Sequence, residues 1–215
     1  MSKIKFISLC SVTLCWQLGS SMAKAQEFVD RAPQIQEMGI MTNYPDGQFH
    51  PERVLSRAQL ATILVKTFGL DSRITEQSQN IILSDVSPEH WAIENIQLVI
   101  NNEIMTVDDR RRFLPNQPVT RAAGLAAFAQ AYGVFYIGEA EISRILAPYP
   151  DRDQIPDWGR RAITTAIFEG LVNIDPATNL IEPNELMTRG DMVYTLNEYF
   201  AKQKNPGTIP TIPLD

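Results

Sequence analysis

An arginine that follows a proline by six residues occurs three times along the chain, at nearly equal intervals. The three arginines are separated by 64 and 68 residues, and they are Arg57, Arg121 and Arg189. The register extends upstream, where Trp91 and Trp158 each lie 13 residues before an aliphatic residue. A period of this length is typical of repeated supersecondary units, which bury their apolar faces against their neighbours. The sequence therefore predicts three equivalent units that share a core.

Each unit has the pattern of a helix, a loop and a second helix. Apolar residues recur at helical spacing over residues 91–104 and again over 158–171. After each loop, a hydroxyl side chain stands where it can accept hydrogen bonds from the first amides of a new helix; these residues are Ser56, Thr120 and Thr188. Gly69 and Gly133 are predicted to end the first two of these helices. The predicted fold class is all-α, with three helix-loop-helix repeats.

The arginines stand in the first turn of the second helices, which is an unfavourable place for a cation. A positive charge there opposes the helix dipole and costs a few tenths of a kcal/mol. A cost that recurs three times indicates that other groups use the guanidinium. Two uses are open from the residues alone: a salt bridge between units, or contact with an anionic ligand through paired hydrogen bonds.

The first 25 residues have the pattern of a signal peptide. Lys3 and Lys5 precede a short apolar stretch, and Ala23-Lys24-Ala25 provides the small residues of a cleavage site, so the mature chain is predicted to begin at Gln26. Both cysteines lie in this segment, so the exported chain is expected to have no disulfide and no thiol. Loss of three lysines takes the net charge from −6 to −9. Such an acidic chain is a poor partner for nucleic acid or an anionic membrane.

The repeated residues resemble the S-layer homology domain, whose pattern includes Asp-Val, His-Trp-Ala, Phe-x-Pro and Thr-Arg-Ala-Glu. The middle unit matches this pattern in Ser84-Asp85-Val86, His90-Trp91-Ala92 and Thr120-Arg121-Ala122. The third unit retains Tyr149-Pro150-Asp151, Trp158 and Thr188-Arg189. The first unit retains Gly39-Ile40, Tyr44-Pro45-Asp46-Gly47 and Ser56-Arg57-Ala58. The resemblance covers residues 28–200, nearly all of the mature chain.

The resemblance implies a pseudo-three-fold helical domain with ligand grooves between its units. It also implies non-catalytic attachment to the cell wall, through peptidoglycan or a linked polysaccharide that often carries pyruvate ketals. The ligand-binding residues that it implies are Arg57, Arg121 and Arg189 for the anion, with Asp85, Asp151, Trp91 and Trp158 shaping the grooves. On this basis Arg121→Ala is expected to weaken wall binding and to leave thermal unfolding nearly unchanged. The protein is expected in the cell envelope, either in the periplasm or on the surface.

The first unit departs from the family pattern at its start. Glu27 stands at the tryptophan position and Ser21 at the aspartate position, and Pro33 is expected to shorten the first helix. The sequence thus divides into a signal peptide over 1–25, a truncated first repeat over 26–70, a second repeat over 81–135, a third repeat over 147–202 and a Pro-rich flexible tail over 203–215. Glutamate is absent from all three Thr-Arg-Ala-Glu positions.

A structural role is an open alternative for each of the implied site residues. The tryptophans could be core residues, and the aspartates could be turn or cap residues. His50 and His90 have no ligand-spaced cluster around them, so no metal is expected, and no cofactor or catalytic motif is present in the sequence. The predicted function is therefore a wall-binding protein and not an enzyme. The alternative is an envelope adaptor with degenerate grooves, whose partner is another protein.

Overall fold

The structure is a computed structural model that describes residues 28–73 and 80–204. Residues 28–37 are helical, and the named α-helices are α2 (Arg57–Phe68), α3 (Ile93–Asn101), α4 (Arg121–Tyr132), α5 (Glu139–Leu146), α6 (Arg160–Phe168) and α7 (Arg189–Lys204). Three short 3-10 turns accompany them: η1 (Leu70–Arg73), η2 (Arg152–Gln154) and η3 (Asp157–Gly159). Within the described ranges the only β-type pairings are three isolated bridges, which confirms the all-α fold class.

The second helices of the three units begin where the hydroxyl caps predict. Ser56 and Gln59 form a complete capping box at the start of α2, and the Thr120 hydroxyl accepts a hydrogen bond from the Ala123 amide. At α7 the Asp191 carboxylate accepts from the Thr188 amide at 2.9 Å, and the Thr188 hydroxyl accepts from the Asp191 amide at 3.1 Å. These reciprocal bonds satisfy amides that the first turn of a helix leaves without partners.

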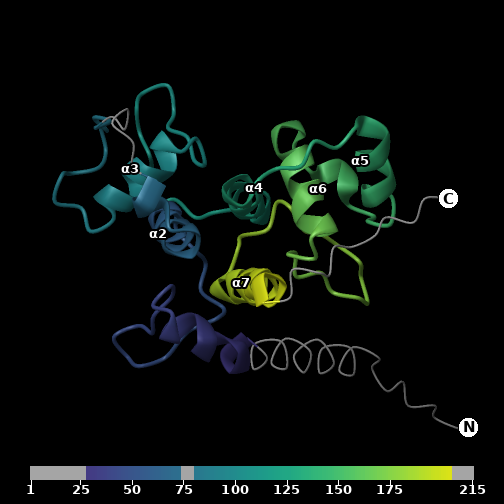
Figure 1. Ribbon diagram of the computed structural model, residues 1–215, viewed down its shortest axis with the longest axis horizontal. Helices are drawn as coiled ribbons and strands as arrows, with labels where there is room; N and C mark the ends of the chain where they lie inside the picture. Colours follow the sequence, from purple (N-terminus) through teal and green to yellow (C-terminus); the bar gives the residue numbers. More distant parts are fainter. Residues whose placement is uncertain (1–27, 74–79, 205–215) are drawn as a thin grey trace, which may run out of the picture.

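A closed triangle of backbone hydrogen bonds joins the three units at the centre. The Leu55 amide donates to the Met187 carbonyl, the Met187 amide to the Val119 carbonyl, and the Val119 amide to the Leu55 carbonyl, at 2.8–2.9 Å. All three residues hold equivalent positions in their units, and all three are buried. The helices α2, α4 and α7 that follow them are grouped around the middle of the molecule (Figure 1). The arrangement therefore has a pseudo-three-fold axis at this triangle.

Each first helix packs against the second helix of the preceding unit. The helix α3 of the second unit packs on α2 of the first, and α6 of the third unit packs on α4 of the second. One polar contact of this kind joins Asn95 Nδ2 on α3 to the Thr62 hydroxyl on α2 at 3.1 Å. The apolar stripe of each unit is thus covered largely by the next unit along the chain, which explains why one helix pair could not fold alone.

The first and last units close the ring. Residues 28–37 lie beside α7, where Arg31 pairs with Glu198 at 2.5 Å and Asn197 Nδ2 donates to the Arg31 carbonyl. The expectation that Pro33 shortens this helix is wrong, because the helical residues continue to position 37. Ala32 and Ile35 on either side of the proline are buried, and this packing outweighs the local cost of a proline in a helix.

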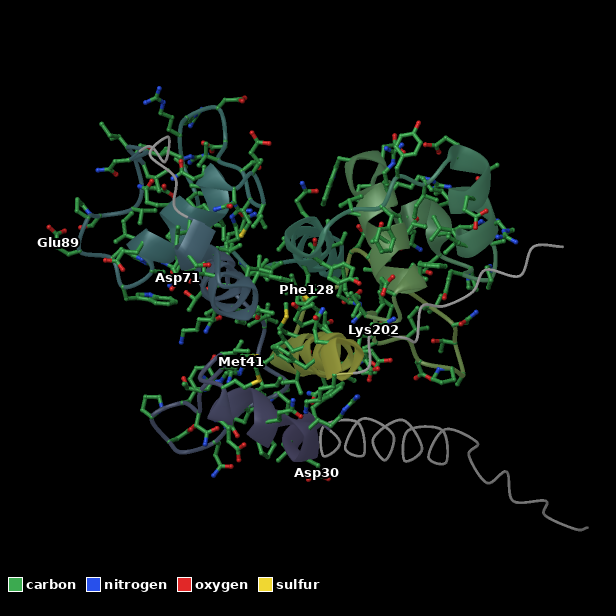
Figure 2. The ribbon with its side chains drawn as sticks, viewed as in Figure 1. Asp30, Met41, Asp71, Glu89, Phe128 and Lys202 are labelled. Carbon is green, nitrogen blue, oxygen red and sulfur yellow. The ribbon has the colours of Figure 1, made fainter. Side chains whose placement is uncertain are left out.

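Aromatic side chains fill the space between the inner helices. Phe128 of α4 is fully buried, and its ring meets Phe68 of α2 at 5.1 Å and Tyr199 of α7 at 5.8 Å between centroids. Figure 2 shows Phe128 near the middle of the molecule, between these helices. Edge-to-face contacts of this kind add to the stabilisation from burial. The core is therefore shared by all three units.

The helix α5 lies between the second and third repeats, where the sequence analysis assigned no element, and its buried Ile142 and Leu146 hold it in contact with α6. The predicted signal peptide, Glu27 at the start of the predicted first repeat, and nearly all of the predicted tail lie outside the described residues. In the described part of the chain, no helix combines the length and apolar character needed to cross a membrane.

Candidate functional site

The three repeated arginines connect each unit to the loop of the next. Arg57 donates through Nε to the Phe113 carbonyl and through Nη2 to the Thr106 carbonyl, both at 2.6 Å. The other two arginines repeat this pattern: Arg121 donates to the carbonyls of Ile181 and Asn173, and Arg189 to those of Phe49 and Thr42. The contacts run from the first unit to the second, from the second to the third, and from the third to the first.

Two of these arginines are buried, and the third is more exposed. Arg121 is 4% exposed and Arg189 is 6% exposed, whereas Arg57 is only partly buried. Nη1 of Arg121 also binds the Asp191 carboxylate at 2.7 Å, which leaves its guanidinium enclosed by protein groups. The alternative of a salt bridge between units therefore holds for Arg121, whereas Arg57 and Arg189 bind backbone carbonyls of the next unit, and these contacts account for a cation at the start of each helix. Ligand contact remains a prediction for Arg57.

The two predicted groove aspartates hold loops in place. Asp151 is buried, and its carboxylate accepts hydrogen bonds from the amides of Ile181 at 3.0 Å and Glu182 at 2.7 Å. Asp85 does the same for the amides of Phe113 and Leu114. Glu182 and Leu114 have positive φ angles of 56° and 58°, a backbone conformation that residues other than glycine rarely adopt. The carboxylates therefore stabilise a strained turn in front of α4 and another in front of α7.

Replacement of Asp151 by alanine should reduce stability. The change leaves the Ile181 amide buried without an acceptor, so we expect the free energy of unfolding to fall by about 2–3 kcal/mol. Urea denaturation of the purified variant measures the change. Asp153→Ala is the matched control, because the Asp153 side chain is 83% exposed and we expect a shift of at most about 0.5 kcal/mol. Equal losses in the two variants would contradict the role assigned to Asp151.

The two predicted groove tryptophans are exposed. Trp91 is 64% exposed and Trp158 is 68% exposed, although both were counted in the apolar series of their helices. The alternative of a core role is therefore wrong for both residues. The residues one position later, Ala92 and Gly159, are buried.

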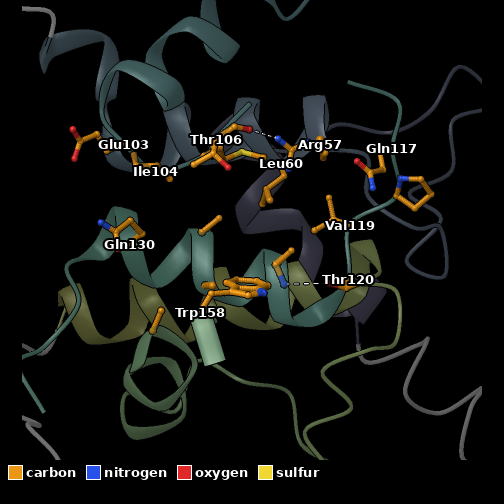
Figure 3. Close-up of a pocket in the computed structure, with 16 residues that line it drawn as sticks. Arg57, Leu60, Glu103, Ile104, Thr106, Gln117, Val119, Thr120, Gln130 and Trp158 are labelled. Atoms are coloured by element: carbon orange, nitrogen blue, oxygen red, sulfur yellow. Dashed lines mark hydrogen bonds between the residues drawn. The ribbon is translucent and has the colours of Figure 1, made fainter. Parts of the chain in front are cut away.

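A cavity of about 540 Å³ lies where all three units meet, and its walls include Trp158 and Arg57. Arg57 and Leu60 come from α2, Glu103 to Thr106 and Gln117 to Thr120 from the second loop, and Trp158 and Ala162 from the start of the third unit. Figure 3 shows Trp158 across the cavity from Arg57 and Thr106. The volume is within the range of small-molecule sites, about 300–1,000 Å³.

Arg57 supplies a cation with spare hydrogen-bonding capacity to this cavity. Within the described residues its Nη1 has no acceptor, while Nε and Nη2 are fixed by carbonyls. Burial lowers the pKa of the Arg57 guanidinium, and the charge of the nearby Asp85 opposes this shift. The group nevertheless stays protonated at neutral pH, because an arginine pKa is far above 7. The cavity can therefore bind an anionic group at Arg57.

Several groups that line this cavity were not predicted from the sequence. Gln117, Gln130, Thr106 and Thr120 add amides and hydroxyls, which can hydrogen-bond to a sugar. Space for the cavity comes from small side chains on α4 and α6, which are Ala123, Ala126, Ala127 and Ala162. The one available signal was Ala123, because the family pattern has a glutamate at this position. Among the described residues, no three metal-binding side chains form a cluster.

Curated relatives with similar sequences are surface proteins of bacteria. The chain is 26% identical over 173 residues to a cellulosome-anchoring protein of Acetivibrio thermocellus; this match covers 79% of the chain and 37% of the relative. It is 25% identical over 158 residues to a surface-layer 125 kDa protein of Lysinibacillus sphaericus, with 72% and 12% covered. The chain thus spans little more than a third of the first relative and much less of the second.

The match to a known family follows the three units of the structure. The S-layer homology domain matches residues 35–61, 83–123 and 148–193, which together are more than half of the chain. Each matched segment ends within the first turns of α2, α4 or α7. The three-unit ring, the repeated arginine contacts and this match agree, and the chain belongs to the S-layer homology domain family.

Proposed function

We propose that this protein attaches to the cell wall by binding a wall glycan, without catalysis, in the cavity between Arg57 and Trp158. The observation that supports the proposal is the cavity itself, which combines an exposed indole ring, a cation with a free nitrogen and several neutral polar groups. An indole ring can cover the apolar face of a sugar, and amides and hydroxyls can bind its hydroxyl groups. Relatives named as anchoring and surface-layer proteins agree with a place in the cell envelope.

The contacts of Arg121, between the second and third units, suggest which group of the glycan reaches Arg57. Arg121 holds the equivalent position there, and its Nη1 binds the carboxylate of Asp191 at 2.7 Å. The residue equivalent to Asp191 beside Arg57 is Ala123, which has no carboxylate and borders the cavity. A carboxylate of the ligand would complete the same pair. The proposed ligand is therefore peptidoglycan or a linked polysaccharide that carries a carboxylate, such as a pyruvate ketal or a lactyl ether.

Sedimentation with isolated, protein-free cell walls tests this proposal. Residues 26–215 should sediment with the walls, and Trp158→Ala should weaken the binding by about tenfold or more, as expected for loss of a central aromatic contact. The melting temperature should not change, because the Trp158 side chain is largely exposed. If the protein stays in the supernatant under conditions where another family member sediments with the walls, this result would overturn the proposal and favour the envelope adaptor. Release of wall fragments over time would instead indicate catalysis.

A further inference from the structure

The three interfaces between units can be compared position by position, because the repeat is nearly ungapped. Each interface has a wall of three residues on the second helix and one facing residue on the first helix of the next unit. We name each interface after the repeated arginine that borders it. At the Arg57 interface, which holds the cavity, the wall is Ala123, Ala126 and Gln130, and the facing residue is Ala162. The equivalent residues are Asp191, Tyr194 and Glu198, facing Arg31, at the Arg121 interface, and Gln59, Thr62 and Lys66, facing Asn95, at the Arg189 interface.

At the Arg121 interface, side chains of the protein occupy the place of the cavity. The Arg31 guanidinium lies over the Tyr194 ring at 5.0 Å from its centroid and pairs with Glu198 at 2.5 Å. Asp191 binds Nη1 of Arg121 as described above. The two guanidinium groups and the aromatic ring that could contact a glycan here are therefore already paired with side chains of the protein.

At the Arg189 interface, two hydrogen bonds hold side chains of α2 in place. Asn95 Nδ2 donates to the Thr62 hydroxyl at 3.1 Å, and Lys66 Nζ donates to the Gly39 carbonyl at 2.7 Å. Gly39 is the equivalent of Glu103, which lies at the edge of the cavity in the Arg57 interface. Lys66 therefore joins α2 to the turn at Gly39 of its own unit, at the position where Gln130 and Glu103 leave the Arg57 interface open (Figure 3).

We infer that the chain has a single working glycan site, at the Arg57 interface, and that its own side chains close the Arg121 and Arg189 interfaces. This inference rests on the proposed function and adds to it the number and place of the sites. It also assigns different roles to the two exposed tryptophans. Trp158 borders the cavity, whereas Trp91 belongs to the Arg189 interface that Asn95 and Lys66 close.

A matched pair of tryptophan variants tests the inference with isolated, protein-free cell walls as the probe. Trp91 and Trp158 are equivalent in the repeat and nearly equal in exposure, so both alanine variants should keep the melting temperature of the parent. For a single site, Trp158→Ala weakens binding by about tenfold or more and Trp91→Ala by less than about twofold. Similar losses in both variants would overturn the single-site inference.

A second experiment closes the open interface with the residues of the Arg121 interface. The double substitution Ala126→Tyr with Ala162→Arg places a ring and a guanidinium in the cavity, as Tyr194 and Arg31 do in their interface. We expect wall binding to fall by about tenfold or more, with a melting temperature at or above that of the parent. Unchanged binding by a folded double variant would contradict the assignment of the site.

The control for this experiment opens a closed interface, with Arg31→Ala and Tyr194→Ala combined. It should leave wall binding within about twofold of the parent, because the site does not include these residues. Reduced binding by this variant, in a form that remains folded at the assay temperature, would count against a single site. If the parent protein does not sediment with the walls, this result would contradict the proposed function itself. It can be told apart from equal losses of binding in the two tryptophan variants, which would contradict only the single site.

Discussion

Arg121→Ala should reduce the free energy of unfolding by about 3–5 kcal/mol, which is the usual cost of removing one partner of a buried ion pair. The substitution leaves Asp191 without its cation, and its side chain is only 13% exposed. It also leaves the carbonyls of Ile181 and Asn173 without the donors that connect the second unit to the third. Urea denaturation followed by circular dichroism measures the loss.

Arg57→Ala provides a graded comparison for this prediction. Arg57 also binds two carbonyls of the next unit, but it lacks a carboxylate partner at the position of Asp191 and is less buried. We therefore expect a smaller loss, about 1–3 kcal/mol. A loss below about 1 kcal/mol for Arg121→Ala would show that the buried contacts contribute little. The sequence alone predicted that small effect, because it treated Arg121 as a residue that faces a ligand.

Gly190→Ala should destabilise the protein, although alanine is the better helix former. In an exposed helix interior, this change stabilises by about 0.5–1 kcal/mol. A Cβ atom at Gly190 would, however, overlap the ring of Phe28, which packs directly against the α7 backbone. Overpacking of this kind costs about 1–3 kcal/mol, so the net effect should be a loss. Thermal and urea unfolding decide the sign.

A double substitution separates overpacking from other effects of Gly190→Ala. The positions equivalent to Phe28 and Gly190 are Ala92 and Ala58 at one interface, and Gly159 and Ala122 at another, so a large residue faces a glycine at only one of the three. In the background of Phe28→Ala, the Gly190→Ala change should be neutral or stabilising, which gives a coupling energy of about 1–3 kcal/mol. An additive result would show that the ring does not press on α7.

The sequence was sufficient for the repeat, the caps and the helical class, because these depend on local patterns. Ser56, Thr120 and Thr188 start their helices as predicted, since a capping residue acts within four residues of itself. The helix α5 was missed because its eight residues bury only Ile142 and Leu146, which is too little for a clear period. Its position is decided by contact with α6, which the local pattern does not contain.

The candidate site was harder to predict because its parts come from different units. A repeat pattern is the same whether a helix packs on its own unit or on the preceding one, so the sequence could not assign the partner of Arg121 or Arg189. It placed the exposed Trp158 in an apolar series for the same reason. The cavity depends on Ala126 and Ala162 facing each other across two units, and a pair of alanines gives no signal along the chain.

Closure of the ring has a consequence for how the chain matures. The ion pair between Arg31 and Glu198 spans 167 residues, so the helix over 28–37 is made first and gains its partner last. At a synthesis rate of about 5–20 residues per second, this helix waits roughly 10–30 s for α7 to appear. Its buried Phe28, whose ring packs against the α7 backbone at Gly190, lacks this cover during that interval. Contacts this distant in sequence also slow folding. The pairing of residues 28–37 with α7 is therefore the folding step at which two chains are most prone to pair with each other.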